Sequence, residues 1–179
     1  MKISETGIKN LMVFDPQVFE DDRGYFYEGY SQNKITNYLK DDFDFNIVQF
    51  NFSKSRKGVL RGLHFQKQPF EQAKLVNVLK GEAWDVAVDL RPGSATYGKW
   101  HGEMLTEENK RRMFIPRGFA HGFIALTEGT ELMYAVDNGY NKESEGGIIY
   151  NDPSLNIDWK MKGGQFILSE KDLILPTLE

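Results

Sequence analysis

The sequence predicts an all-β protein that is built as a sandwich or a barrel. Short apolar or alternating segments recur along the chain, and Gly, Pro or Asn residues separate them. Aromatic residues make up 13% of the chain, a bias that is typical of β-rich proteins. Many short strands with little helix predict a two-sheet sandwich or a barrel, and the jelly roll is one such solution.

One segment has the pattern of a helix, and the others have the pattern of strands. Residues 31–40 read SQNKITNYLK, where Ser31 suits the N-cap and Ile35, Tyr38 and Leu39 fall on one face. The strands that we expect lie at residues 47–53, 73–79, 83–90, 112–115, 122–126 and 131–136. The turn residues at 80–82 (KGE) predict that the second and third of these strands form a hairpin.

Polar and apolar residues alternate along the strand that we expect at residues 47–53. One face is apolar and the other is polar: Val48, Phe50 and Phe52 against Gln49, Asn51 and Ser53. Such a polar face is either a solvated outer surface or the lining of a wet cavity inside the fold. The sequence leaves both interpretations open.

Composition and charge exclude several classes of protein. The chain has 179 residues and no internal linker or repeat, so we expect one domain over residues 1–179. The net charge of −4 gives no basic surface for nucleic acid, and the chain has no cysteine for disulfides or thiolate chemistry. No apolar run approaches the roughly 20 residues of a membrane span, and no signal peptide is evident. We therefore expect a cytoplasmic protein with no nucleic-acid or membrane partner.

Two histidines lie in motifs that resemble the signatures of the cupins. His64 ends the run GVLRGLH at residues 58–64, and His121 ends the run PRGFAH at residues 116–121. These runs are similar to the cupin patterns G-x5-H and P-x-G-x-x-H. The resemblance implies a cupin-like double-stranded β-helix, which is a jelly roll, with a few short helices.

The metal ligands of the cupin pattern are incomplete in this chain. Gln66 stands where a metal-binding cupin has its second histidine, and a neutral amide is a poor ligand for transition metals. A set of His64, Glu71 and His121 is conceivable, but we expect no metal. His64 is then free for proton transfer, which suits the ordinary imidazole pKa near ~6.5. We interpret His101 as structural.

Further motifs resemble one family over essentially the whole chain. They are RGLHFQ (61–66), QAKLV (72–76), DVAVDLR (85–91), IPRGFAHGF (115–123), DDRGYFYE (21–28), Tyr134, Tyr140 with Glu145, NDP (151–153) and LSEKD (168–172). Together they make the chain similar to the dTDP-4-dehydrorhamnose 3,5-epimerases, which are metal-independent isomerases of nucleotide-linked sugars.

The resemblance implies epimerisation of dTDP-4-dehydro-6-deoxy-D-glucose to dTDP-4-dehydro-L-rhamnose, in dTDP-L-rhamnose biosynthesis for cell-surface polysaccharide. In such enzymes the C4 ketone acidifies the protons on C3 and C5, and each is removed and then returned on the opposite face. The reaction needs no cofactor. Two alternatives stay open: a single-position epimerase or ketoisomerase on a related dTDP-sugar, and a metal-dependent or non-catalytic cupin.

The resemblance also implies four catalytic residues. His64 matches the base, and Asp172 matches the carboxylate that orients it, although Ser169 to Asp172 also has the pattern of a helix capping box. Lys74 matches the cation that stabilises the enolate oxygen. Tyr134 matches the acid that returns the proton from the opposite face, and a nearby Lys74 would stabilise its phenolate.

The residues that the resemblance implies for binding the dTDP-sugar are Arg23, Phe26, Glu28, Gln49, Asn51, Arg61, His121, Tyr140 and Glu145. Arg61 suits the diphosphate, while Phe26 and Tyr140 offer stacking surfaces for the pyrimidine. Arg23 and Glu28 match residues that reach the nucleotide from the neighbouring subunit. This match implies a homodimer with an exchanged N-terminal strand.

The strand that carries His64 requires an irregularity. Arg61 and His64 would point to opposite faces of a regular strand, because side chains alternate along it. Both reach one pocket only if the strand is bulged or twisted, and we expect this near Gly62.

Overall fold

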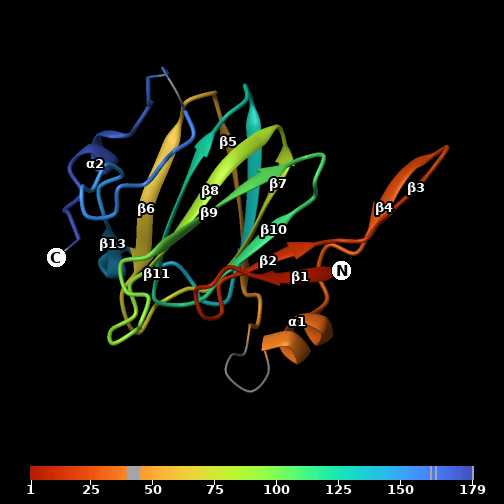
Figure 1. The fold of residues 1–179 in the computed structure, drawn as a ribbon, viewed down its shortest axis with the longest axis horizontal. Coiled ribbons are helices and arrows are strands. Elements are labelled where there is room, and N and C mark those ends of the chain that lie inside the picture. The colour runs from red at the N-terminus through yellow and green to blue at the C-terminus, as the bar shows by residue number, and fades with distance from the viewer. Residues whose placement is uncertain (40–44, 162, 164, 179) are drawn as a thin grey trace.

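The computed structural model describes residues 1–39, 45–161, 163 and 165–178, which form two main β-sheets (Figure 1). The six-stranded sheet has the order β1 (Lys2–Glu5), β2 (Met12–Asp15), β10 (Arg112–Ile115), β7 (Lys74–Lys80), β12 (Thr130–Val136) and β5 (Gln49–Ser55). The five-stranded sheet has the order β13 (Glu145–Gly147), β6 (Leu60–Gln66), β11 (Phe119–Ala125), β8 (Glu82–Asp89) and β9 (Trp100–Thr106). The chain passes repeatedly from one sheet to the other, and the predicted all-β jelly roll is confirmed.

The apolar core lies between the two sheets and shares its strands with a polar region. Val76 of β7 and Leu132 of β12 pack in one cluster with Ala87 of β8, and all three are fully buried or nearly so. Two residues along the same strands, β7 carries Lys74 and β12 carries Tyr134. Each strand therefore contributes to the dry core in one part and to a polar cavity in the next.

Segments outside the sheets cover their outer faces. Ile35 of α1 (Gln32–Leu39) and Phe45 pack with Phe114 against the six-stranded sheet. Leu155 and Trp159 cover the outer face of the five-stranded sheet. The chain then passes through α2 (Glu170–Leu173), and a single turn of 3-10 helix, η2 (Lys142–Ser144), precedes β13. Within the described part of the chain, no helix is both long and apolar enough to span a bilayer.

The predicted elements are found with modest changes at their ends. The helix expected at residues 31–40 runs over Gln32–Leu39, and Lys40 lies outside the described residues. The strand expected at 112–115 has those bounds, while β11 and β12 begin before their expected starts. Tyr38, which we expected on the apolar face of the helix, is 38% exposed.

The predicted hairpin around residues 80–82 is wrong. The two strands exist, but β7 belongs to the six-stranded sheet and β8 belongs to the five-stranded sheet. Gly81, with a φ of 75°, carries the chain across the sandwich instead of back along one sheet. A turn between two buried strands looks the same in sequence whether it joins neighbours in one sheet or strands of two sheets.

Strand β5 forms one edge of the six-stranded sheet, and its polar face points inward. Asn51 and Ser53 line the cavity between the sheets. The apolar residues of the other face are exposed, with Phe50 at 54% and Phe52 at 69%. Of the two interpretations that the sequence left open, the wet cavity is therefore the correct one.

A two-stranded arm extends from the body of the molecule. Strands β3 (Val18–Asp21) and β4 (Gly24–Tyr27) pair only with each other among the described residues, and Figure 1 shows them projecting away from both sheets. Phe19, Tyr25 and Phe26 on this arm are 55%, 58% and 70% exposed. The arm contacts the body near its base, where the Nζ of Lys110 lies 4.0 Å from the ring centroid of Tyr25, yet this concentration of exposed aromatic surface is unusual for a projecting segment.

Candidate active site

A cavity of about 580 Å³ lies between the sheets, which is a size that suits a small ligand. Both sheets contribute walls, and the segment around α2 contributes the rim. The site residues expected from the sequence that line it are Asn51, Arg61, His64, Lys74, His121, Tyr134, Tyr140, Glu145 and Asp172. Residues scattered over more than a hundred positions thus surround one space.

His64 of β6 and Asp172 of α2 form a pair across 108 positions of sequence, with Nε2 of the imidazole 2.5 Å from Oδ1 of the carboxylate. The Asp172 side chain is 4% exposed, whereas that of His64 is 39% exposed. Burial lowers the pKa of His64, and the hydrogen bond and charge of Asp172 oppose this effect. Lys74 and Lys171 lower the pKa of His64 further through their positive charge. The imidazole is therefore held as a neutral base that carries its own carboxylate.

The short helix α2 places Asp172 for this contact. Ser169 is the N-cap, and its hydroxyl accepts a hydrogen bond from the backbone N–H of Asp172 at 3.2 Å. In a complete capping box the carboxylate would turn back to the N-cap N–H. Here the Asp172 carboxylate reaches His64 instead. The cap is therefore present, and the Asp172 carboxylate makes the contact with His64 that the family resemblance implies, while its catalytic role stays a prediction.

Strand β6 is irregular where the sequence required it. The pairing of β6 with β11 shifts register between His121 and Phe123, and Gly62 has a φ of 125°. A Cβ at Gly62 would lie 2.5 Å from the Cα of Gly122, so a side chain has no room there. Because of this irregularity, Arg61 and His64 both line the cavity.

Lys74 and Tyr134 lie on the opposite wall, which the six-stranded sheet provides. Lys74 is only 8% exposed, and burial lowers its pKa to about 8. Its Nζ lies 5.7 Å from the ring centroid of Tyr134. Burial raises the pKa of Tyr134, and the charge that opposes this effect is that of Arg61, where we had expected Lys74. Tyr134 is consequently a protonated donor at neutral pH.

A second histidine and carboxylate pair lies deeper between the sheets. Nε2 of His121 is 2.7 Å from Oδ1 of Asp85, and both side chains are almost fully buried. Sequence reasoning missed Asp85. The sequence did contain one signal. Asp85 lies on the same face of β8 as Ala83 and Ala87, which pack in the core. A carboxylate on such a face is costly to bury without a purpose.

The rim of the cavity carries a further residue that the sequence did not suggest. Lys171 of α2 lines the cavity, and its Nζ lies 2.5 Å from Oε2 of Glu145. Tyr140 lies on the same rim and is 57% exposed. An aromatic ring beside a cation and a carboxylate suits a nucleotide base and its phosphates.

Comparisons with known proteins decide the family. The profile of the dTDP-4-dehydrorhamnose 3,5-epimerase family matches residues 5–179. The chain belongs to this family. The dTDP-4-dehydrorhamnose 3,5-epimerase of Shigella flexneri is 46% identical over 173 residues, which are 97% of this chain and 93% of the relative.

Solved structures of epimerases agree with this membership. The crystal structure of dTDP-4-dehydrorhamnose 3,5-epimerase from Elizabethkingia anophelis has a TM-score of 0.94 and 51% identity, covering 99% of this chain and 96% of the other. The dTDP-6-deoxy-D-glucose-3,5-epimerase from Legionella pneumophila, in complex with dTDP-4-keto-L-rhamnose, has a TM-score of 0.90 and 45% identity, covering 99% and 98%. The predicted 3,5-epimerase family, isomerase class and cupin fold are confirmed.

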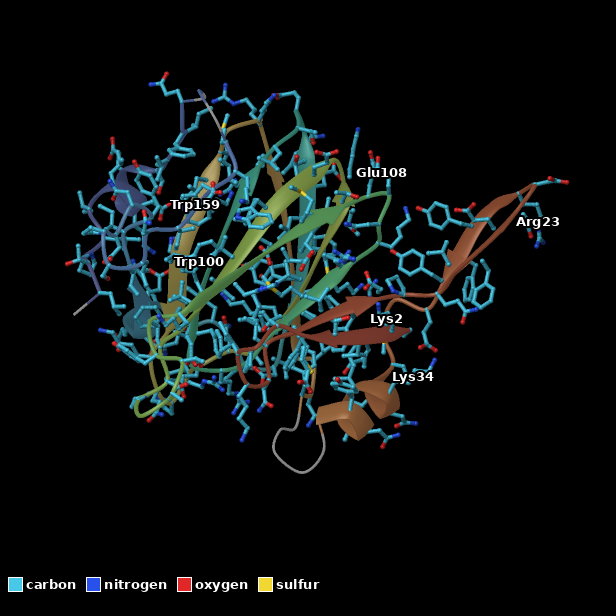
Figure 2. The ribbon with its side chains drawn as sticks, viewed as in Figure 1. Lys2, Arg23, Lys34, Trp100, Glu108 and Trp159 are labelled. Carbon is cyan, nitrogen blue, oxygen red and sulfur yellow. The ribbon has the colours of Figure 1, made fainter. Side chains whose placement is uncertain are left out.

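Four binding residues expected from this family resemblance do not line the cavity of their own chain. They are Arg23, Phe26, Glu28 and Gln49. Figure 2 shows Arg23 at the far tip of the arm, where it pairs with Asp21. Glu28 pairs with Lys34 at 2.8 Å. Gln49 donates a hydrogen bond to the side chain of Asn51, which does line the cavity.

The three residues of the conceivable metal set do not form a ligand group in this epimerase-family fold. Nε2 of His64 and Nε2 of His121 each lie beside a carboxylate, and Glu71 does not line the cavity. The side-chain oxygen of Gln66 accepts a hydrogen bond from the backbone N–H of Asn141. Among the residues that the structure describes, no three His, Asp or Glu side chains are grouped closely enough to hold a metal ion.

Proposed function

We propose that the cavity epimerises dTDP-4-dehydro-6-deoxy-D-glucose at C3 and C5, as a cytoplasmic step of dTDP-L-rhamnose biosynthesis. One observation carries this proposal. On one wall His64 is paired with the carboxylate of Asp172, and the other wall provides the buried cation of Lys74 and the partly buried phenol of Tyr134. Removal of a proton beside a ketone needs a base, a stabiliser for the enolate oxygen, and an acid on the opposite face.

His64 is the base in this mechanism. Burial and two neighbouring lysines lower its pKa, so its neutral form is available at pH 7 to accept a proton from C3 or C5. Once the proton arrives, Asp172 stabilises the imidazolium through the contact that already orients the ring. Because Nε2 contacts Asp172, Nδ1 is the nitrogen that accepts the proton, and the partial exposure of His64 leaves it accessible to substrate.

Lys74 and Tyr134 complete the proton transfer from the six-stranded sheet. The ammonium of Lys74 binds the C4 oxygen as negative charge develops there, and burial strengthens that interaction. Tyr134 returns a proton to carbon from the face opposite His64, and its raised pKa keeps it protonated until then. Each wall of the cavity therefore serves one face of the sugar.

The nucleotide binds toward the rim. The guanidinium of Arg61 matches a diphosphate, and the exposed ring of Tyr140 matches the pyrimidine. The remaining polar contacts to sugar, phosphate or base come from Gln49, Asn51, His121 and Glu145. Lys171, which lies beside Glu145, adds a second cation for the diphosphate.

A homodimer supplies Arg23, Phe26 and Glu28 to the cavity of its partner. The arm that carries them leaves its own body, and the exposed aromatic residues on it need a surface to cover them. Strand β5 offers an unpaired edge and an exposed apolar face with Phe50 and Phe52 next to the cavity. Exchange of the two arms covers both surfaces.

Mixing of two inactive variants tests the exchange. Arg23→Ala damages the arm and His64→Leu removes the base, so neither homodimer is fully active. A mixed dimer pairs an intact His64 with an intact partner Arg23 at one of its two sites. Recovery of activity after mixing supports the exchange, and a monomer by light scattering or no recovery in a mixed dimer contradicts it.

Deuterium exchange tests the reaction itself. EDTA-treated protein is incubated with dTDP-4-dehydro-6-deoxy-D-glucose in D₂O, and NMR follows the signals at C3 and C5. Exchange at both carbons supports the proposal. Exchange at one carbon indicates a single-position epimerase, and exchange that starts only after a divalent metal is added indicates a metal-dependent cupin. Binding without any exchange indicates a non-catalytic protein.

A further inference from the structure

Asp85 is a buried carboxylate that the mechanism above does not use. It lies on β8 with no exposed surface and does not line the cavity. Its Oδ1 is 2.7 Å from Nε2 of His121, while its Oδ2 has no hydrogen-bond partner among the described residues. A carboxylate with one unsatisfied oxygen in an apolar core is costly, so something must compensate for its charge.

The charge of Asp85 acts on Lys74, because it raises the pKa of that buried ammonium against the effect of burial. The buried ammonium of Lys74 lies on the opposite sheet, and Asp85 is the carboxylate that stabilises it. The cavity that Lys74 lines holds further titratable or charged groups: Arg61, His64, His121, Tyr134, Tyr140, Glu145, Lys171 and Asp172. Its two carboxylates have other partners, because Asp172 contacts His64 and Glu145 contacts Lys171, whereas the charge of Asp85 raises the pKa of Lys74.

We propose that Asp85 is a positioning residue that fixes the imidazole of His121 and keeps Lys74 charged inside the cavity. This role rests on the epimerase mechanism and adds a residue that acts through two others. An ionised carboxylate only accepts hydrogen bonds, so Nε2 of His121 carries the proton that Asp85 receives. Nδ1 is then the ring nitrogen that remains available to a ligand.

The charge on Lys74 depends on a balance between burial and Asp85. Burial lowers the pKa of Lys74 to about 8, and the negative charge of Asp85 limits the fall. Without Asp85 the pKa falls below that value, so the lysine becomes neutral at lower pH. A neutral amine stabilises an enolate poorly, and the alkaline limb of the pH profile therefore reports on Asp85.

The pH dependence of kcat/KM in the Asp85→Asn variant tests the proposal. We expect the alkaline limb to move to lower pH, with the deficit relative to the unmodified protein growing about tenfold from pH 6 to pH 9. Loss of the fixed His121 ring adds a deficit that does not vary with pH. In a Lys74→Arg background, whose guanidinium stays charged, Asp85→Asn should leave the alkaline limb in place.

A structural control separates this effect from general damage. Asp152 is also a buried aspartate, and it accepts backbone hydrogen bonds from Ser154, Leu155 and Leu178 outside the cavity. Asp152→Asn should lower thermal stability and leave the alkaline limb unchanged. A folded Asp85→Asn variant whose limb also stays unchanged overturns the proposal, while the deuterium exchange of the unmodified protein judges the epimerase function separately.

The unmodified protein provides a test that does not depend on the folding of a variant. NMR of ¹⁵N-labelled histidine identifies which ring nitrogen of His121 is protonated. We expect the Nε2–H tautomer throughout the pH range of activity. An Nδ1–H tautomer would mean that Asp85 does not receive this proton, and the proposal would fail.

Discussion

The two histidine and carboxylate pairs of the cavity differ in how they are built. His64 and His121 lie opposite each other on the paired strands β6 and β11. The partner of His121 is Asp85 on the next strand of the same sheet, whereas the partner of His64 is on a four-residue helix near the C-terminus. The His64 side chain is 39% exposed and that of His121 is 7% exposed.

In the proposed mechanism these two pairs of the same residue types have different roles, one in proton transfer and one in positioning. A base must contact the substrate and exchange its proton, so it needs an accessible ring and a neighbour that tolerates a change of charge. A positioning pair needs a fixed ring, which burial and the rigid sheet provide. In the proposed mechanism the sheet fixes His121 with Asp85, and a separate helix carries the carboxylate that pairs with the proposed base, His64.

The largest expected difference between the two pairs is in the effect of removing each histidine, because His64 is the proposed base. We expect His64→Leu to lower the rate of exchange at C3 and C5 by about 10² to 10⁴, the usual contribution of a general base. His121→Leu should lose less activity but more stability, about 1–3 kcal/mol, because it leaves Asp85 buried and unpaired. Exchange kinetics and denaturant unfolding measure the two quantities.

His101→Leu is the matched control for the histidine pair. His101 lies on β9, contacts Glu103 and does not line the cavity. We expect exchange rates close to those of the unmodified protein. Equal activity losses in the variants at His64 and His121 would show that exposure does not distinguish the two pairs.

Loss of the positive charge of Lys74 should have the next largest effect on the rate. Lys74→Met keeps the length of the side chain and removes its charge, so we expect kcat to fall by about 10² to 10³ with a smaller change in KM. The deficit should be largest below pH 8, where Lys74 is charged in the unmodified protein. Steady-state kinetics over pH 6 to 9 would measure it, and a deficit that is larger at pH 9 would contradict this role.

The Asp172→Asn variant tests the His64 pair through the acid limb of the pH profile of kcat/KM. Asp172 raises the pKa of His64 against the effect of burial, so its removal lowers that pKa further. Because the neutral imidazole is the base, the acid limb of kcat/KM should move to lower pH while the maximal rate falls about 10²-fold. An acid limb that moves to higher pH would mean that Asp172 does not stabilise the imidazolium.

Much of the site was predictable from sequence because its residues lie in local motifs. RGLHFQ carries Arg61 and His64, and the alternation at residues 47–53 already indicated a polar face, although not whether it points inward or outward. The expected irregularity near Gly62 followed from side-chain alternation together with the family resemblance, which places Arg61 and His64 in one pocket. Local patterns specify which residues share a face of a strand, and the structure shows that the polar face of β5 lines the cavity.

The remaining features depend on contacts that local patterns do not encode. The false hairpin at residues 80–82 failed because the choice of sheet depends on distant partners of β7 and β8. The meeting of Asp172 with His64 was expected only from the family, since it joins residues 108 positions apart. Asp85 was missed because a carboxylate in a strand is usually solvated, and only its buried partners reveal its role.

The smallest expected effect concerns the N-cap of α2, which supports the His64 and Asp172 pair but not the His121 and Asp85 pair. Ser169 caps α2 and accepts the N–H of Asp172, so Ser169→Ala should cost about 1 kcal/mol and loosen the His64 pair. Ser154→Ala is the control, because the Ser154 hydroxyl bonds Asp152 outside the cavity. We expect a modest loss of kcat in Ser169→Ala alone, with the tautomer of His121 unchanged in both. If both variants lose equal activity, the cap does not position the base, and α2 contributes only to stability.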